Sequence, residues 1–104
     1  MAQFDVYLNP NQKTNQQIPF LLDVQADMLD SLATRIVVPL FLPSAFGKPV
    51  QHLTPQFKIK SKKVIMSTAE LAGVSVTILG DKIANLHESR NEIIAALDFL
   101  FTGI

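Results

Sequence analysis

The sequence contains no cysteine, no tryptophan and a single tyrosine, and charged residues make up only 17% of its 104 residues. Without cysteine the protein can form no disulfide, no thiolate nucleophile and no thiol-based metal site, so we expect it in the reducing cytoplasm. Nine lysines and arginines balance nine aspartates and glutamates. Because this balance provides no attraction to nucleic acid or to an acidic membrane, we expect a protein partner.

Long hydrophobic runs are absent as well. The longest, IVVPLFLP at residues 36–43, is far shorter than the ~20 residues that span a bilayer. The N-terminal MAQFDVYLNP has no basic segment followed by an apolar one, so we expect no secretory signal. The length fits one domain, residues 1–104. Since 48% of the residues are nevertheless hydrophobic, we expect a permanent partner, most simply a second copy in a homodimer.

Short segments of alternating or β-branched residues, separated by polar turns, indicate a mainly β protein. We predict strands in residues 3–8, 18–26, 35–42 and 74–79, and a hairpin in residues 56–67. Residues 9–17 are polar and lack periodicity, which predicts an exposed loop, and residues 43–55 form a proline-rich connection. Pro39 cannot donate to a sheet ladder, so we expect the strand at 35–42 to be bulged there or to lie at an edge.

Only the C-terminal stretch has helical periodicity. Asn85 and Glu88 have the spacing of a capping box, and a helix start nearer His87 is equally compatible with the sequence. The apolar residues that repeat at helical spacing are Leu86, Ile93, Ile94, Leu97, Leu100 and Phe101. Several short antiparallel strands followed by one helix predict an SH3-like, partly open antiparallel β-barrel with a C-terminal α-helix.

The last residues of the chain predict a specific helix ending. If Thr102 is the C-cap, Gly103 falls where a left-handed conformation is needed. Ile104 then packs back on Phe99, which completes a Schellman-type ending. This ending accounts for the glycine but not for the apolar character of Phe101 and Ile104 together.

The sequence contains no recognisable catalytic, metal-binding or cofactor-binding constellation. Nothing in it brings His52 and His87 together, and a metal site would need more ligands at suitable spacing. Asp23, Asp27 and Asp30 are close in sequence, but strand geometry separates their directions, so turn and cap roles are expected for them. We therefore predict a protein that is not an enzyme and needs no cofactor.

One basic cluster is present, made up of Lys58, Lys60, Lys62 and Lys63. Lysines on a hairpin deter edge-to-edge strand pairing. No aromatic residues alternate with these lysines to stack on bases. We interpret the cluster as a solvated hairpin and expect no direct nucleic-acid binding.

Four stretches of the chain resemble CcdB, the toxin family of ccd toxin–antitoxin modules. They are QFDVY at 3–7, LLDVQADMLD at 21–30, TRIVVPL at 34–40 and NEIIAALDFLFTGI at 91–104. The resemblance implies a homodimer with an SH3-like fold of the CcdB and MazF type. It also implies a toxin without catalysis, which binds the A subunit of DNA gyrase and traps the enzyme on cleaved DNA. A CcdA-like antitoxin would neutralise it.

The resemblance also implies two sets of contact residues. Those facing gyrase are Gln3, Phe4, Tyr7, Ala26, Met28, Leu29, Asp98, Phe101, Thr102, Gly103 and Ile104, the last three being the decisive group. Those facing the antitoxin are Asn9, Gln12, Lys13, Phe41 and Phe46, in the loop 9–17 and the connection 41–47.

The chain departs from the family pattern at one of these positions. The best-known members end in Trp-Gly-Ile, whereas this chain ends in Thr-Gly-Ile. The tryptophan can stack on a gyrase arginine, a contact of about 1–2 kcal/mol when desolvated. Thr102 cannot make this contact, and we hypothesise that Asp98 or the Ile104 carboxylate pairs with the arginine instead.

Two other functions are compatible with the same fold. The first is an endoribonuclease like the Kid and MazF toxins, which needs a basic RNA-binding face with a positioned acid–base pair. The lysine hairpin is the only such face the sequence offers. The second is a non-toxic remnant that still binds an antitoxin, whose overexpression would not arrest growth.

Overall fold

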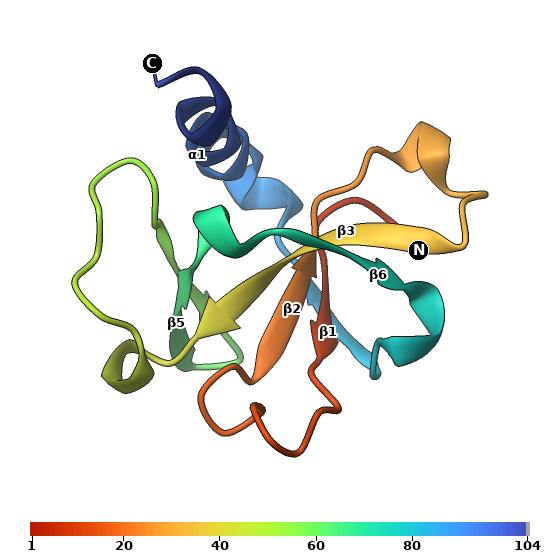
Figure 1. Ribbon diagram of the computed structural model, residues 1–104, viewed down its shortest axis with the longest axis horizontal. Helices are drawn as coiled ribbons and strands as arrows, with labels where there is room; N and C mark the ends of the chain where they lie inside the picture. The colour runs from red at the N-terminus through yellow and green to blue at the C-terminus, as the bar shows by residue number, and fades with distance from the viewer. Residues whose placement is uncertain (104) are drawn as a thin grey trace.

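A computed structural model describes residues 1–103, which form a curled antiparallel sheet and one C-terminal helix (Figure 1). The seven strands of this part of the chain are β1 (Asp5–Leu8), β2 (Phe20–Asp23), β3 (Thr34–Phe41), β4 (Gln56–Ile59), β5 (Lys62–Met66), β6 (Ala72–Ser75) and β7 (Lys82–Asn85). They lie in the order β4-β5-β3-β2-β1-β7, and β6 pairs with β3. The helix is α1 (Arg90–Thr102). The predicted mainly β fold with a C-terminal helix is confirmed.

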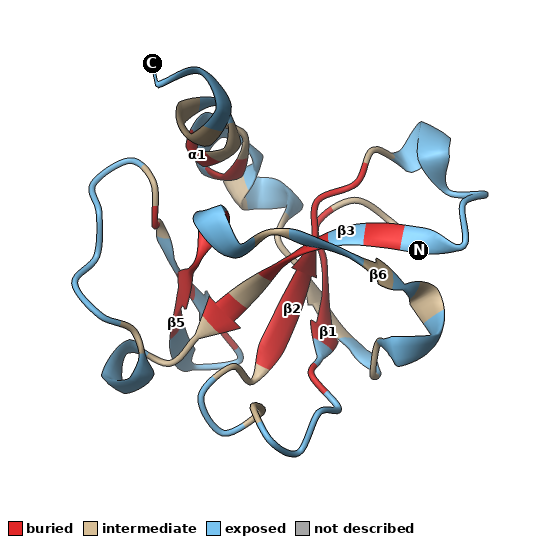
Figure 2. Ribbon diagram, viewed as in Figure 1, coloured by how far each residue is buried: buried red, intermediate tan, exposed pale blue. Residues whose placement is uncertain are grey.

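The core lies between one face of the sheet and α1. Alternate residues of the strands, such as Val6, Leu22 and Val38, are fully buried, and Ile93 and Ala96 reach them from α1. Figure 2 shows that this burial is concentrated on β1, β2, β3 and β5, whereas most of the connecting segments are exposed. Burial of apolar area at roughly 25 cal/mol per Å² is the main favourable term that holds the helix on the sheet.

The other face of the sheet also buries residues, but several of them are polar. The register pairs Val6 with Leu22 and Leu22 with Val38. Because side chains alternate along a strand, the residues next to these positions point to the opposite face. Those residues include Asp5, Tyr7 and Asp23, and Arg35, three residues before Val38, shares their face by the same alternation; all four are buried.

The predicted hairpin in residues 56–67 is confirmed as β4 and β5. Its two-residue turn, Lys60 and Ser61, has φ values of 48° and 71°. Two left-handed residues in succession match the right-handed twist of the flanking strands. The predicted strands in residues 3–8, 18–26 and 35–42 are likewise present as β1, β2 and β3, with shorter bounds in the first two.

The prediction for Pro39 is wrong, because β3 is neither bulged against β2 nor at an edge. Leu21 pairs in register with Pro39 on one side. On the other side, β6 pairs with residues 34–37 and β5 with residues 40–41. Pro39 therefore lies where β3 changes partner, and its carbonyl accepts a hydrogen bond from the Ser67 N–H at 3.0 Å. Between the residues paired with β6 and those paired with β5, no strand residue requires an N–H donor at Pro39, so the proline is tolerated there.

The predicted strand at residues 74–79 is present only at its start, because residues 74–75 belong to β6 and residues 76–79 are not strand. β6 ends at Ser75, and Val76–Ile78 form a 3₁₀ turn. The Ser75 hydroxyl accepts a hydrogen bond from the Thr77 N–H at 3.3 Å, which favours the turn over continued strand despite the β-branched residues. The sequence also did not reveal β7, which pairs with β1 after the Gly80–Asp81 step.

The predicted helix is confirmed, although its start differs from a capping box. A 3₁₀ turn at His87–Ser89 precedes α1, and the Asn85 side chain accepts from the His87 N–H at 2.8 Å. At the other end Gly103 is left-handed, with φ 74°, and its N–H donates to the Phe99 carbonyl at 2.9 Å. The predicted packing of Ile104 on Phe99 lies outside the described residues. Within residues 1–103 no helix has the length and apolar character of a membrane span.

Candidate partner-binding surface

The loop between β2 and β3 carries exposed apolar side chains. Residues Asp27–Leu29 form a 3₁₀ turn, and the Gln3 N–H donates to the Asp27 carboxylate at 2.6 Å. Met28 is 90% exposed and Leu29 is 46% exposed. None of the three turn residues is buried, so the turn presents its apolar side chains to solvent.

The end of α1 provides a second exposed apolar element. Phe101 is 72% exposed, and Asp98, Thr102 and Gly103 are also exposed. The Thr102 hydroxyl donates to the Asp98 carbonyl at 2.6 Å, so this hydroxyl is directed back along the helix. The carboxylate of Asp98 makes no ion pair with another described residue.

An open groove of about 510 Å³ joins these two elements. Its lining is made of Val24, Gln25, Ala26, Leu29, Leu32, Thr34, Ile36, Leu71, Leu97 and Phe101. Nearly all of these side chains are apolar. A groove of this composition is suited to burying apolar side chains of a partner rather than to chemistry on a polar substrate.

The groove contains three of the residues predicted to face gyrase, which are Ala26, Leu29 and Phe101. Met28 adjoins Leu29 on the same turn, and the Gln3 side chain donates to the Val24 carbonyl at 3.2 Å. The structure therefore brings residues from the N-terminus, the β2–β3 loop and α1 toward one surface. Ile104, which belongs to the predicted decisive group, lies outside the described residues.

Phe4 and Tyr7 do not present their side chains on this surface. Phe4 is 3% exposed and packs in the core, because its left-handed backbone, with φ 71°, turns the chain inward before β1. Tyr7 is 5% exposed and lies on the polar buried face of the sheet. Both side chains can support the surface from within but cannot contact a partner.

The groove also contains seven residues that the sequence analysis did not assign to a partner surface, which are Val24, Gln25, Leu32, Thr34, Ile36, Leu71 and Leu97. The sequence could have indicated Leu32 as a surface contact, because it is an apolar residue within the polar turn segment DSLAT. Leu97 was predicted as part of the apolar face of the helix, and nothing distinguished it from the core residues. Ile36 and Leu71 become neighbours only through pairing between β3 and β6.

The predicted antitoxin residues lie on two adjacent segments. Asn9 is buried and organises its loop, since its side chain donates to the Thr14 hydroxyl at 3.0 Å and to the Ile18 carbonyl at 2.9 Å. The Leu42 N–H donates to the Gln17 carbonyl, which places the connection after β3 beside this loop. Gln12 and Lys13 are exposed, and the rings of Phe41 and Phe46 meet edge to face at 5.4 Å.

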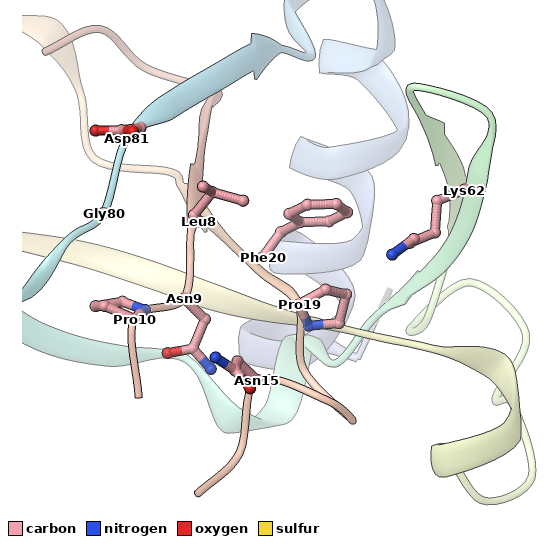
Figure 3. A pocket seen from close by; sticks show the side chains of 9 residues that line it. All are labelled: Leu8, Asn9, Pro10, Asn15, Pro19, Phe20, Lys62, Gly80 and Asp81. Carbon is pink, nitrogen blue, oxygen red and sulfur yellow. The ribbon is translucent and has the colours of Figure 1, made fainter. Parts of the chain in front are cut away.

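A second open cavity, of about 500 Å³, adjoins the same loop (Figure 3). Figure 3 shows Leu8, Pro19 and Phe20 along it, with Lys62 reaching toward it from β5. The Lys62 ammonium lies 5.9 Å from the centre of the Phe20 ring, within cation–π range. In Figure 1 this loop and the end of α1 are at opposite ends of the molecule.

A buried carboxylate anchors the N-terminal segment to β7. Asp5 accepts hydrogen bonds from the Ala2 N–H, the Tyr7 hydroxyl and the Asn85 side chain, and its carboxylate lies 3.2 Å from the Lys82 ammonium. Burial opposes ionisation of Asp5, but the hydrogen bonds from Asn85 and Ala2 and the charge of Lys82 hold its pKa below the ordinary value. Burial and the neighbouring charge of Asp5 raise the pKa of Tyr7 to about 12.

A second buried carboxylate, Asp23, forms an ion pair with Arg35 at 2.7 Å. Burial raises the pKa of Asp23, and the hydrogen bonds from Arg35 and from the Gln25 N–H offset part of this effect. Burial likewise opposes the charge on Arg35, but Asp23 raises the pKa of the guanidinium overall. The turn role predicted for Asp23 is confirmed in part, since its carboxylate accepts from the Gln25 N–H two residues on at 2.9 Å, but the residue is also a buried ion-pair partner on β2, which was not predicted.

The two histidines have different neighbours. The His52 ring lies 6.2 Å from the Phe99 ring, whereas His87 contacts the Asn85 side chain. Among residues 1–103 no group of three or more His, Asp or Glu side chains is close enough to hold a metal ion.

Comparison with protein-family models matches residues 3–103 to the family described as CcdB protein. The match therefore includes the β2–β3 loop, the groove and the described end of α1. A mainly β fold with a curled antiparallel sheet and one C-terminal helix agrees with this family. The chain belongs to the CcdB family, whose members are toxins of toxin–antitoxin systems.

Proposed function

We propose that this protein is a toxin that binds the A subunit of DNA gyrase and traps gyrase on cleaved DNA. The observation that carries the proposal is the exposed apolar surface made by Ala26, Met28 and Leu29 on the β2–β3 loop and Phe101 at the end of α1. Large exposed apolar side chains around a groove are typical of protein-binding sites.

The surface acts by binding rather than by catalysis. Its side chains provide apolar area and the carboxylates of Asp27, Asp30 and Asp98, and none of them is a nucleophile paired with a general base. A protein that stabilises one state of gyrase needs only differential affinity for that state. A surface of this kind can therefore trap a gyrase–DNA complex by binding alone.

The proposal includes a homodimer. A second copy, packed next to the exposed end of α1, would place two copies of Phe101 and Gly103 close together. A two-fold symmetric toxin is then matched to a two-fold symmetric target. The excess of apolar residues, 48% of the chain, supports this assembly.

Thr102 remains the unusual residue of the surface. Its hydroxyl donates to the helix backbone, so it offers a partner a methyl group and an acceptor oxygen but no aromatic ring. The nearby Asp98 carboxylate, which is exposed, is the residue we propose to pair with a gyrase arginine in place of the family tryptophan.

A CcdA-like antitoxin is proposed to neutralise the toxin through the loop 9–17 and the connection 41–47. The hydrogen bond between Leu42 and Gln17 supports treating the two segments as one surface. The adjoining cavity near Phe20 and Lys62 extends that surface. An antitoxin bound there would leave the gyrase-facing end accessible, so a single antitoxin chain would need to extend along the toxin to block it.

The test is a gyrase cleavage assay with a matched pair of variants. Leu29 and Ile78 each end a three-residue 3₁₀ turn, and they are 46% and 47% exposed. Leu29→Asp should abolish the accumulation of cleaved DNA, whereas Ile78→Asp should leave it unchanged. Deletion of residues 102–104 should also abolish it without unfolding the protein.

The same assay separates the other functions. Wild-type protein that produces no cleavage complexes at micromolar concentration with a cognate gyrase would refute the proposal. Sequence-specific cleavage of added RNA would support an endoribonuclease instead. Overexpression without growth arrest, together with antitoxin binding, would identify a non-toxic remnant.

A further inference from the structure

A charged residue lies directly beneath the exposed β2–β3 loop. The side chain of Arg35, on β3, is completely buried, and so is that of its partner Asp23 on β2. Burying an ion pair carries a large desolvation cost, and well-packed apolar residues in its place are often neutral or stabilising. Stability alone therefore does not require an arginine at this position.

The guanidinium of Arg35 contacts the loop at its base and beyond its turn. Nε donates to the Asp23 carboxylate at 2.7 Å, and Nη2 donates to the Gln25 carbonyl at 3.3 Å. Nη1 lies 3.5 Å from the Asp30 carboxylate. Three nitrogens of one planar group thus join the end of β2, the start of the loop and the residue that follows the 3₁₀ turn.

Gln25 extends this network into the loop. Its side-chain nitrogen donates to the Leu29 carbonyl at 3.0 Å, and its side-chain oxygen accepts from the Ile36 N–H at 3.0 Å. Its own N–H donates to the second oxygen of Asp23 at 2.9 Å. Both oxygens of Asp23 are therefore engaged, one by Arg35 and one by Gln25.

The turn has no apolar anchor of its own. None of Asp27, Met28 and Leu29 is buried. In the described residues, the polar contacts that hold the turn to the rest of the protein are the Arg35 and Gln25 network, the hydrogen bond from Gln3 to Asp27, and an ion pair at 3.6 Å between the Met1 ammonium and Asp30. Polar contacts, rather than core packing, fix the direction in which Met28 and Leu29 point.

We propose that Arg35 is a positioning residue for the partner-binding surface. It holds the β2–β3 loop in the one shape that places Ala26, Met28 and Leu29 beside Phe101, so that the loop need not be ordered when the partner binds. The inference rests on the proposed function for the identity of the partner, but the ordering of the loop by Arg35 does not depend on that identity.

The test removes the charges but retains the volume. In the Asp23→Asn, Arg35→Met double variant, the asparagine oxygen can still accept from the Gln25 N–H, and methionine fills the space of the arginine stem. We expect a folded protein with a single unfolding transition whose affinity for the isolated gyrase A subunit falls about tenfold or more. Val64→Ala, a buried change on β5, is the control for lost stability and should leave this affinity unchanged.

Two further measurements separate positioning from a purely structural role. Met28→Ala should weaken binding in the wild-type background but have a much smaller effect in the double variant, because a mobile loop no longer presents Met28. The single variant Asp30→Asn, on an exposed residue that faces both the Arg35 guanidinium and the Met1 ammonium, should weaken binding in the same direction but by less. It provides the decisive comparison if the double variant does not fold.

Hydrogen exchange provides a readout that needs no gyrase. The Leu29 and Asp30 amides, which donate to Ala26 and Asp27, should exchange faster in the double variant and in Asp30→Asn than in the wild type, while β1–β2 amides are unchanged. Unchanged exchange at these two amides, or unchanged affinity in a folded double variant, would overturn the inference. If wild-type protein does not bind gyrase, the proposed function fails, and the exchange experiment alone decides the role of Arg35.

Discussion

The ionisation of Tyr7 can be followed in isolation, because it is the only tyrosine and the chain has no tryptophan. Its hydroxyl donates to the buried Asp5 carboxylate at 3.2 Å. Removing the phenolic proton would place two negative charges side by side in a buried site. Burial and the charge of Asp5 accordingly raise the pKa of Tyr7 from 10 to about 12.

The size of this effect on stability follows from the difference between folded and unfolded protein. The folded-state pKa is raised, so the contribution of Tyr7 is fully present below pH 10 and is lost as the pH rises from 10 to about 12. The slope is about 1.4 kcal/mol per pH unit, which gives a total loss of about 3 kcal/mol from this group.

The assay is the near-ultraviolet absorbance of tyrosinate as a function of pH. Native protein should titrate with a midpoint near 12, and protein unfolded in urea should titrate near the ordinary value of 10. Asp5→Asn should lower the native midpoint toward 10, since it removes the neighbouring charge. Tyr7→Phe should remove the corresponding part of the alkaline stability loss. A native midpoint near 10 in protein that is still folded would refute the argument.

Three other predictions concern stability and binding. Gly80→Ala should lower the free energy of unfolding in urea by about 1–3 kcal/mol, since a Cβ there would lie 2.6 Å from the Leu8 carbonyl oxygen. Gly47→Ala, whose Cβ would meet nothing within 4 Å, should be nearly neutral, and equal effects of the two changes would contradict this reasoning. Thr102→Trp should tighten binding to the gyrase A subunit by about tenfold in calorimetry; an unchanged affinity would mean that the gyrase contact differs from that of the family. Because its folded-state pKa is lowered, Asp5 contributes stability above its ordinary pKa of 3.8 that is lost as the pH falls through the folded value. Acid unfolding of Asp5→Asn should therefore depend less on pH below 4 than that of wild type, and identical profiles would exclude this contribution.

Local patterns predicted much of the fold. The hairpin of β4 and β5, the C-terminal helix and the left-handed Gly103 all follow from interactions between residues close in sequence. The predictions failed where a contact between residues far apart in the sequence overrode a local preference. β7 was missed because its strand character comes from pairing with β1, and Pro39 was misplaced because its tolerance depends on two separate partner strands.

The candidate surface was predictable only in part. Family resemblance pointed to Ala26, Leu29 and Phe101, and the fold places all three on one groove. The polar network beneath the loop was not predictable, since Arg35 occupies one position in the mostly apolar segment TRIVVPL. Arg35 and Val37 lie on the same face of β3, because alternate strand residues share a face, and Val37 is buried. A charged residue on the same face as an apolar strand residue is the signal that could have revealed the network.

The pairing of β1 with β7 has a consequence for the synthesis of the protein. The Asn85 side chain reaches Asp5 across 80 residues of sequence. A polypeptide that stops before Lys82 lacks the strand that covers one edge of β1, and it also lacks Ile93 and Ala96 from the core. Interrupted translation products should therefore be unable to adopt the active fold. A cell that makes this protein would be exposed to it only after nearly all of the chain has left the ribosome.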